Sequence, residues 1–417
     1  MNTKRIVGLA IALVAWNLGT AQDLFITNAR IIDGTGETID RGSVSVVDGR
    51  IVSVGPEVMN GSGATVLDAG GMTLMPGMMD THWHVLTTTD ATDEAIDRYI
   101  EDTVVDVLEG VLAWGMTTIM AAGDHFPHIL EVRRMLADGE IRGPRLLTVG
   151  PVLTAPGDWT TQTCDGERLC EMKRTAQLTT PEQARAKVRE LAAGNVDALK
   201  IIYDDIRVPE IRLDDDVIAA ITDEASQHDL VVHAHVSTVD ETALKLVDLG
   251  VRGFLHPVAL HKPENSDGTR ILRELEIPVV TTNSGSSREW REATGREWPE
   301  NAQASFRGRQ RDVEHLWNGG VTLVFGTDAM SSSGSQAPAK FMAEARALNR
   351  VLPNYEVIQT LTRNASIFLG LEDELGTIES GKIADIVLID GDPLADISAL
   401  GNARVVIQSG RVVVDKR

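Results

Sequence analysis

Short apolar runs alternate with amphipathic segments through the middle of the chain. The apolar runs are rich in Val, Ile, Leu and Thr and end in turn-forming residues, which is typical of buried strands. The segments between them carry apolar residues at helical spacing, for example over residues 181–193 and 213–228. The strand-like runs cover residues 73–80, 117–122, 145–149, 196–202, 230–235, 253–256, 277–282 and 321–328. Eight strand and helix repeats of this size predict an α/β fold, a closed parallel (β/α)8 TIM barrel.

Both ends of the chain follow a different pattern, with short β-rich stretches that are broken by turns. Residues 43–47 turn at Asp48-Gly49 into residues 51–54, which is a hairpin signal. Residues 384–389, 404–408 and 411–414 repeat this style near the other end. Because neither end has the helical periodicity of the middle, we predict one small β-sandwich domain built from residues 22–74 and 373–417. The barrel would then occupy residues 75–372.

The first residues have the three-part form of a secretory signal peptide. Lys4 and Arg5 precede an apolar stretch over residues 6–16, and the small residues Gly19-Thr20-Ala21 follow it. A membrane anchor is the alternative, but this apolar stretch is too short to span a bilayer. We therefore predict that residues 1–21 are a signal peptide and that the protein is exported to the bacterial periplasm or secreted. No stable membrane association is expected after cleavage.

Two cysteines, Cys164 and Cys170, flank a polar stretch. In an oxidising compartment, two cysteines at this spacing would close a small loop as a disulfide, and export favours this pairing over two free thiols.

The overall charge disfavours two classes of partner. The formal net charge is −22, and removal of Lys4 and Arg5 with the signal peptide would take two positive charges away and make it −24. Such a surface repels nucleic acid and anionic membranes. We expect a small-molecule substrate as the partner. The charge does not distinguish a monomer from a homo-oligomer.

The ends of the predicted strands carry the candidate chemistry. His82 and His84 lie two residues apart where the first strand stops, so both side chains point to the same side. Two imidazoles that converge in this way make half of a divalent-metal site. Trp83, between them, would point the opposite way and pack against the barrel wall.

Further ionisable residues end or interrupt the later strands, in order along the chain. Each has a structural alternative, as a hydrogen-bonded core histidine, a turn-capping aspartate or a lysine that reaches the surface. In a TIM barrel, however, the carboxyl ends of all strands meet at one face. Their joint placement predicts a metal site formed from His82, His84, Lys200, His233, His256 and Asp328.

These motifs resemble the amidohydrolase superfamily over nearly the whole mature chain. Within it, the sequence is most similar to the imidazolonepropionase-like and prolidase-like branch, which includes Xaa-Pro and Xaa-Arg/Lys dipeptidases. The resemblance rests on residues 74–84, on Lys200, His233, His256 and Gly326-Thr327-Asp328, and on residues 27–34 and 375–387, which flank the barrel in the composite β-sandwich of that family.

The resemblance implies a role for each metal-site residue. His82, His84 and Asp328 would hold the more buried ion, and His233 and His256 the more exposed one. Lys200 would be carboxylated by carbon dioxide and bridge both ions, which argues for two metals. Zinc fits this ligand set best, and manganese, cobalt and iron are compatible with it. A hydroxide bridging the two ions would attack the substrate carbonyl, while Asp328 accepts its proton and then protonates the leaving amine.

Other side chains are candidates for substrate contacts. His235 lies on the same strand face as His233, so we interpret it as a transition-state or substrate contact, with a structural role as the alternative. Tyr203, just beyond the Lys200 strand, would hydrogen-bond a carbonyl oxygen if it faces the cleft. Arg288 and Arg291 lie in a long loop after the seventh strand and are candidates to bind a substrate carboxylate, although a solvated loop explains either one.

The sequence therefore predicts an exported, binuclear metal-dependent hydrolase that cleaves an amide C–N bond in a dipeptide or N-acyl amino acid. A cyclic-amide hydrolase, a deaminase, an esterase or a lactonase of the same fold is the alternative. Deaminase relatives generally carry a glutamate shortly after the fifth-strand histidine, whereas here no acid follows His233 until Asp240. A metal-binding or solute-binding protein without catalysis is the rival from another class.

Overall fold

The computed structural model of the chain describes residues 23–88, 90, 92–157, 174–203, 211–236, 240–257, 266–331 and 336–417. The predicted signal peptide and the predicted Cys164–Cys170 disulfide lie outside these residues. Within the described part of the chain, no helix is long and apolar enough to cross a membrane.

Strands from both chain ends form one eight-stranded sheet. They are β1 (Leu24–Ile32), β2 (Thr38–Val47), β3 (Arg50–Gly55), β4 (Thr65–Asp68), β5 (Thr73–Pro76), β17 (Ile386–Ile389), β18 (Ala403–Gln408) and β19 (Arg411–Asp415). The order β19-β18-β17-β5-β1-β2-β3, with β4 beside β1, joins the two ends through β5 and β17. Buried residues such as Ile26, Leu74 and Ile386 give this sheet its own apolar core.

β2 and β3 pair in antiparallel fashion around Asp48 and Gly49, which both have positive φ. The predicted hairpin is therefore present. The contribution of both chain ends to one β-rich unit is thus observed. Its further division into the two layers of a sandwich stays a prediction.

The middle of the chain contains two parallel sheets. Four strands pair in the order β16-β6-β7-β8, and seven pair in the order β10-β9-β11-β12-β13-β14-β15. Their bounds are β6 (Met78–His84), β7 (Met116–Ala121), β8 (Arg145–Thr148), β9 (Val152–Thr154), β10 (Thr175–Gln177), β11 (Leu199–Tyr203), β12 (Val232–Val236), β13 (Gly253–Phe254), β14 (Val279–Val280), β15 (Leu323–Val324) and β16 (Ala329–Met330).

Two stretches of chain take part in both sheets. Residues 145–154 supply β8 to one sheet and β9 to the other, and residues 323–330 supply β15 and β16 in the same way. The strand runs predicted from the sequence after the first one overlap β7, β8, β11, β12, β13, β14 and β15, with bounds that differ by at most four residues, so the parallel α/β architecture is confirmed.

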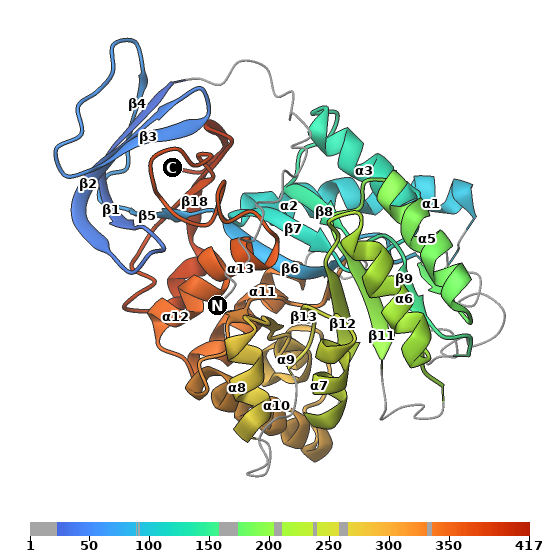
Figure 1. Cartoon of the computed structure of the whole chain (residues 1–417). Coiled ribbons are helices and arrows are strands. Elements are labelled where there is room, and N and C mark those ends of the chain that lie inside the picture. Colours follow the sequence, from blue (N-terminus) through green and yellow to red (C-terminus); the bar gives the residue numbers. More distant parts are fainter. Residues whose placement is uncertain are drawn as a thin grey trace, which may run out of the picture.

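Helices cover the parallel strands on their outer side (Figure 1). They are α1 (Asp93–Tyr99), α2 (Val105–Ala113), α3 (His128–Ala137), α5 (Pro181–Ala193), α6 (Asp215–Ser226), α7 (Asp240–Asp248), α8 (Ser266–Glu274), α9 (Arg288–Ala293), α10 (Glu300–Asn318), α11 (Ala337–Asn349), α12 (Asn354–Thr360) and α13 (Arg363–Phe368). Helix α5 matches its predicted bounds because Thr180 caps it by accepting from Gln183 N, and Pro181 occupies its first turn.

The first predicted strand, residues 73–80, is wrong as a single element. Gly77 divides it into β5, which belongs to the terminal sheet, and β6, which belongs to the four-stranded sheet. At this break Gly77 N donates to Asp385 O, and the buried pair Arg145–Asp385, 2.8 Å apart, also links the two units. Glycine is required here because a Cβ at position 77 would lie 2.2 Å from Thr117 Oγ1.

A separate apolar cluster packs against residues of both parallel sheets. Its members include Met79, Met120, Leu147, Val280 and Val324, which come from five different strands. Phe368 at the end of α13 belongs to the same cluster. The candidate site lies further along the strands, beyond this cluster.

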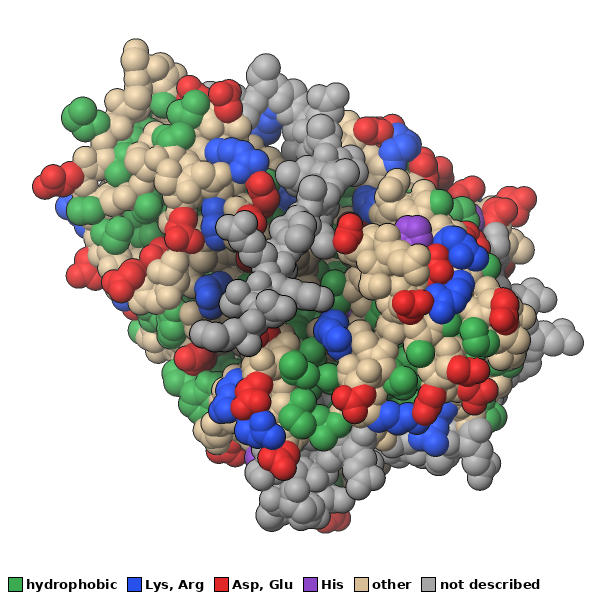
Figure 2. Space-filling view, viewed as in Figure 1, with side chains coloured by type: hydrophobic (Ala, Val, Ile, Leu, Met, Phe, Trp, Pro, Cys, Tyr) green, Lys and Arg blue, Asp and Glu red, His purple; other side chains and the backbone are tan. Residues whose placement is uncertain are grey.

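Charged residues of both signs are interspersed on the surface. On the face drawn in Figure 2, Lys and Arg side chains lie among the acidic ones and are not gathered into one patch. The excess of acidic groups, 61 against 39 Lys and Arg, therefore dominates the net charge without separating the signs.

We predict that Gly77→Ala lowers the free energy of unfolding by about 1–3 kcal/mol, because the added methyl group cannot fit against the fully buried Thr117. Gly61→Ala is the matched control, since nothing lies within 4 Å of a Cβ there. Urea unfolding of both variants measures the difference. Equal stabilities for the two variants would contradict the steric role of Gly77.

Candidate metal centre

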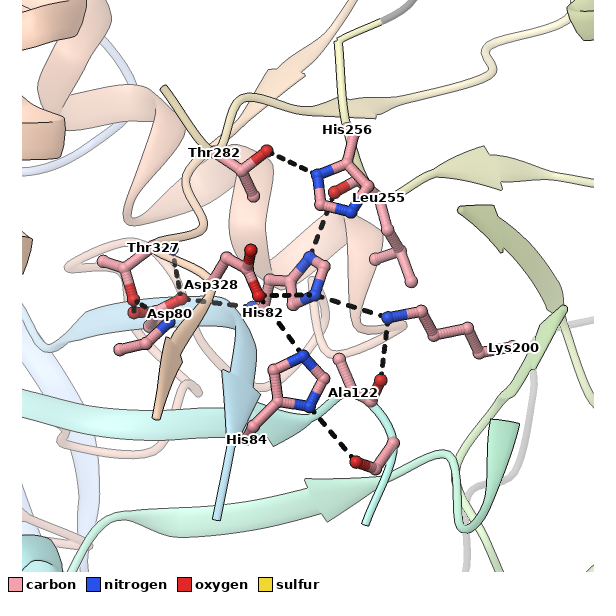
Figure 3. A network of polar contacts seen from close by, with 12 residues as sticks. Asp80, His82, His84, Ala122, Lys200, Leu255, His256, Thr282, Thr327 and Asp328 are labelled. Carbon is pink, nitrogen blue, oxygen red and sulfur yellow. Dashed lines mark hydrogen bonds and ion pairs between the residues drawn. The ribbon is translucent and has the colours of Figure 1, made fainter. Parts of the chain in front are cut away.

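His82 and His84 end β6 and face the same side of the strand, where Asp328 meets them (Figure 3). Asp328 Oδ1 lies 3.5 Å from His82 Nε2 and 3.2 Å from His84 Nε2. One ligand atom from each of the three residues lies within 4.8 Å of the others. Trp83 is fully buried on the opposite side, in the helix-facing core, as predicted.

The imidazoles are held with one ring nitrogen turned towards the centre. Their Nδ1 atoms contact Leu255 O (His82, 3.0 Å), Gly123 O (His84, 3.1 Å) and Thr282 Oγ1 (His256, 2.8 Å). A carbonyl oxygen only accepts, so Nδ1 of His82 carries the proton and its Nε2 keeps the lone pair, which is the tautomer that binds a metal through Nε2. Nδ1 of His84 lies 3.1 Å from Gly123 O and also 3.1 Å from Arg174 Nη2, which is a donor, so the contacts of that ring fit either tautomer.

Burial keeps these rings neutral. It lowers the pKa of His84 and holds the pKa values of His82 and His256 well below their usual range, and the Lys200 ammonium adds to the effect in all three. Neutral imidazoles and a carboxylate are good ligands for a divalent cation. The residues present therefore fit the metal site that their pattern predicts.

The side chain of Lys200 reaches this group from β11, a central strand of the seven-stranded sheet. Its Nζ donates to Ala122 O at 2.9 Å and lies 3.4 Å from His82 Nε2. The side chain is buried, and burial lowers the pKa of its amine to about 8. A substantial fraction of Lys200 is thus in the neutral, nucleophilic form near pH 8.

Asp328 reaches the histidines from an unusual backbone conformation. Its φ is +55°, in the left-handed region, and its N–H donates to His82 O at 2.8 Å. Its carbonyl accepts from Lys340 Nζ. Burial acts to raise the pKa of the carboxyl group, but His82, His84 and Lys340 together hold that pKa well below its usual range. About 39% of the side chain is exposed, so the carboxylate is accessible to solvent.

A buried carboxylate behind the centre fixes this geometry. Asp80 Oδ1 accepts from His82 N at 3.1 Å and from Thr327 N at 3.0 Å, while Oδ2 accepts from the Thr327 hydroxyl at 2.6 Å. Asp80 is fully buried, and burial raises its pKa to about 7 in spite of these three bonds. The clamp ties β6 to the residue before Asp328 (Figure 3).

The sequence analysis did not single out Asp80 or Thr327. The signal was present, however, because Asp80 is an acidic residue inside an apolar strand run. The same kind of mismatch drew attention to Lys200.

His235 lies beside the ring of His256, where the sequence analysis had placed His233. The rings of His235 and His256 lie 4.3 Å apart, and those of His256 and His82 lie 4.9 Å apart. His233 instead stacks on Phe368 at 4.3 Å, at the level of that apolar cluster. Both histidines share one strand face, so their depth along β12 decides which of them reaches the centre. His235 is the one near the carboxyl end of that strand.

Tyr203 does not join the centre. It lies three positions beyond Lys200 in β11, on the opposite face, and packs in the helix-side core. Its hydroxyl accepts from Lys245 Nζ at 3.2 Å. The alternation of side chains along the strand turns Tyr203 away from the centre in this structure, and its predicted substrate contact stays a prediction.

Arg288 and Arg291 also have local partners. Arg288 pairs with Glu292 at 2.6 Å within α9, and both side chains are more than half exposed. Arg291 Nε donates to Glu297 O at 2.5 Å. These contacts match the alternative of a solvated charged segment.

Comparison with known proteins gives a consistent family match. The model of the amidohydrolase family matches residues 73–413. A 5′-deoxyadenosine deaminase of Methanothermobacter thermautotrophicus is 23% identical over 88% of this chain and 85% of its own length. An imidazolonepropionase of Maricaulis maris is 23% identical over 90% and 94%. The crystal structure of a prolidase complexed with N-methylphosphonate-L-proline superposes with a TM-score of 0.78, at 23% identity, over 94% of this chain and 100% of that one.

We predict that Thr327→Val weakens divalent-metal binding at this centre and lowers the free energy of unfolding by about 1–3 kcal/mol, because Asp80 Oδ2 loses its hydrogen bond while buried. Thr327→Ser keeps the hydroxyl and is the control. Metal titration by calorimetry and urea unfolding measure the two effects. The clamp would be refuted if the valine variant matched the serine variant in both.

Proposed function

The chain belongs to the amidohydrolase family, and from this premise we propose that it is a binuclear metal-dependent hydrolase that cleaves the C–N bond of an amide. The observation that carries the proposal is the convergence of His82, His84 and Asp328 with the Lys200 amine beside His82 Nε2. The proposed substrate is a dipeptide or an N-acyl amino acid. The two stretches of chain shared between the parallel sheets support a closed (β/α)8 barrel as the scaffold.

Lys200 is the proposed bridge between two ions. Its neutral amine would add to the carbon of carbon dioxide and release a proton, which leaves a carbamate on Nζ. The lowered pKa of Lys200, about 8, supports this step because only the uncharged amine is nucleophilic. His82, His84 and Asp328 would hold one ion beside the carbamate, and zinc suits this His-rich set.

His235 and His256 would hold the second ion. Their rings lie together next to His82, whereas His233 packs on Phe368 in the apolar cluster. This assignment replaces His233 by His235 as the fifth-strand ligand. It follows from the depth of the two residues along β12 and not from their residue type.

The metals, when bound, would supply an activated water near neutral pH and polarise the substrate carbonyl. The residues of the chain would then manage the protons. Asp328 is partly exposed to solvent and its pKa is held low, so its carboxylate is ionised and ready to accept a proton from water. It would pass that proton to the departing nitrogen, which leaves as an amine.

A deaminase is the second candidate, because the relatives include a deaminase of 5′-deoxyadenosine. The sequence after His235 speaks against it, since Val236, Ser237, Thr238 and Val239 offer no acid to protonate a ring nitrogen.

The proposal also includes export to the periplasm or to the outside of the cell, with cleavage after Ala21. We also retain the division into a composite terminal domain and a barrel of residues 75–372.

Metal content tests the ligand assignment. Purified protein should hold about two divalent ions per chain, and Lys200→Ala should lower this to one or none without rescue by bicarbonate. His235→Asn should lose metal, whereas His233→Asn should retain it. His228→Asn, at a partly exposed surface position, is the control. Elemental analysis of the folded variants decides, and loss of metal from the His233 variant alone would restore His233 as the ligand.

Activity on a substrate panel tests the function. Metal-loaded protein should hydrolyse Xaa-Pro dipeptides, Xaa-Arg dipeptides or N-acyl amino acids, and Asp328→Asn should lower kcat by at least about a hundredfold. The panel also includes 5′-deoxyadenosine, simple esters and lactones. Release of ammonia from the nucleoside alone would favour the deaminase. Two bound ions without turnover of any substrate would favour a non-catalytic metal-binding protein.

A further inference from the structure

Arg174 brings a guanidinium group to the edge of the metal centre. Its Nε and Nη2 donate to Gly123 O at 3.2 and 3.1 Å, and Nη2 lies 3.1 Å from His84 Nδ1. The same carbonyl oxygen is the partner of His84 Nδ1. Arg174 contacts Nδ1 of the His84 ring, and Nε2 on the other side of the same ring faces Asp328.

The guanidinium retains donors for another group. Nη2 is within hydrogen-bond distance of both Gly123 O and His84 Nδ1, and the tautomer of His84 decides whether that ring nitrogen accepts from it. Both N–H groups of Nη1 have no acceptor among the described residues. They remain able to donate to a carboxylate, with which arginine forms strong, charge-assisted hydrogen bonds.

The charge of Arg174 also lacks a counterpart within the described part of the chain. Other arginines pair with carboxylates, such as Arg133 with Asp197 and Arg145 with Asp385, whereas no carboxylate there lies within 4 Å of Arg174. This is notable in a protein with a net charge of −22, in which acidic groups are in excess. A partly buried cation without an anion is costly unless a ligand supplies one.

The guanidinium lies close to the centre itself, because its Nη2 is 3.1 Å from His84 Nδ1 and the Nε2 atom of the same ring is 3.2 Å from Asp328 Oδ1. A substrate with an anionic group near its scissile bond would gain from the field of this cation, and a neutral substrate would not.

We propose that Arg174 binds the carboxylate of the substrate, on the leaving-group side of the scissile amide. This inference rests on the proposed amide hydrolysis and assigns a residue to the recognition of the leaving amino acid, which dipeptides and N-acyl amino acids have in common. It assigns to Arg174 the role that the sequence pattern suggested for Arg288 and Arg291, which are paired locally. It also disfavours nucleosides, which carry no carboxylate.

Paired substrates test the proposal by kinetics. Each N-acyl amino acid or dipeptide is compared with its C-terminal amide, for the wild type, Arg174→Met, Arg174→Lys and the exposed control Arg288→Met. Arg174→Met should raise the ratio of KM for each free acid to KM for its amide by at least tenfold, which a disturbance of His84 alone would not do because it would affect both substrates alike. Arg174→Lys should restore part of the loss. An equal loss on acids and amides, or a loss of metal, would make Arg174 a positioning residue for His84 and overturn the proposal.

Binding provides a readout that does not depend on turnover. Calorimetry with the metal-loaded protein compares free proline, methionine and arginine with their amides. The wild type should bind at least one free acid tenfold more tightly than its amide, and Arg174→Met should abolish this preference. Equal binding of acids and amides by the wild type would contradict the carboxylate site. If the acids bind through Arg174 but no amide is hydrolysed, the proposed function fails and the carboxylate site stands.

Discussion

The buried carboxylate of Asp80 joins the strand that carries two histidines to the loop that carries Asp328. It accepts three hydrogen bonds, one from His82 N and two from Thr327, and it has no access to water. Removal of the Thr327 hydroxyl would leave Oδ2 buried and without its donor, and an unpaired buried oxygen destabilises the fold by more than a typical hydrogen bond stabilises it. The position of Asp328, in a left-handed backbone conformation beside His82 O, therefore depends on a residue that touches no substrate.

Around this clamp, backbone carbonyls set the chemistry of the histidines. Leu255 O fixes the tautomer of His82, Gly123 O contacts the ring of His84, and burial keeps both rings neutral. The strand framework thus positions the ring nitrogens that face Asp328 before any ion binds. Lys200 enters the same space from a neighbouring strand, where burial makes its amine easier to deprotonate.

The comparisons identify the family of the chain, whereas the local geometry bears on the charge of its substrate. The family match extends over residues 73–413, and the named relatives include both a nucleoside deaminase and an imidazolonepropionase at 23% identity. Family membership therefore leaves the leaving group open. Arg174, which contacts His84 and has no carboxylate within 4 Å among the described residues, is the residue that we propose distinguishes anionic from neutral substrates.

The sequence by itself was enough to predict the parallel α/β architecture and the contribution of both chain ends to one β-rich unit. It also predicted that His82, His84, Lys200, His256 and Asp328 lie near one another. These follow from periodicity and from charged residues at the ends of apolar runs, which are local properties. Only the tertiary structure decided that His235 and not His233 meets His256, that Tyr203 faces away, and that Gly77 breaks the first strand. Residue type and alternation give the face of a strand, whereas depth along it, and contact with residues distant in sequence, depend on how neighbouring strands are aligned.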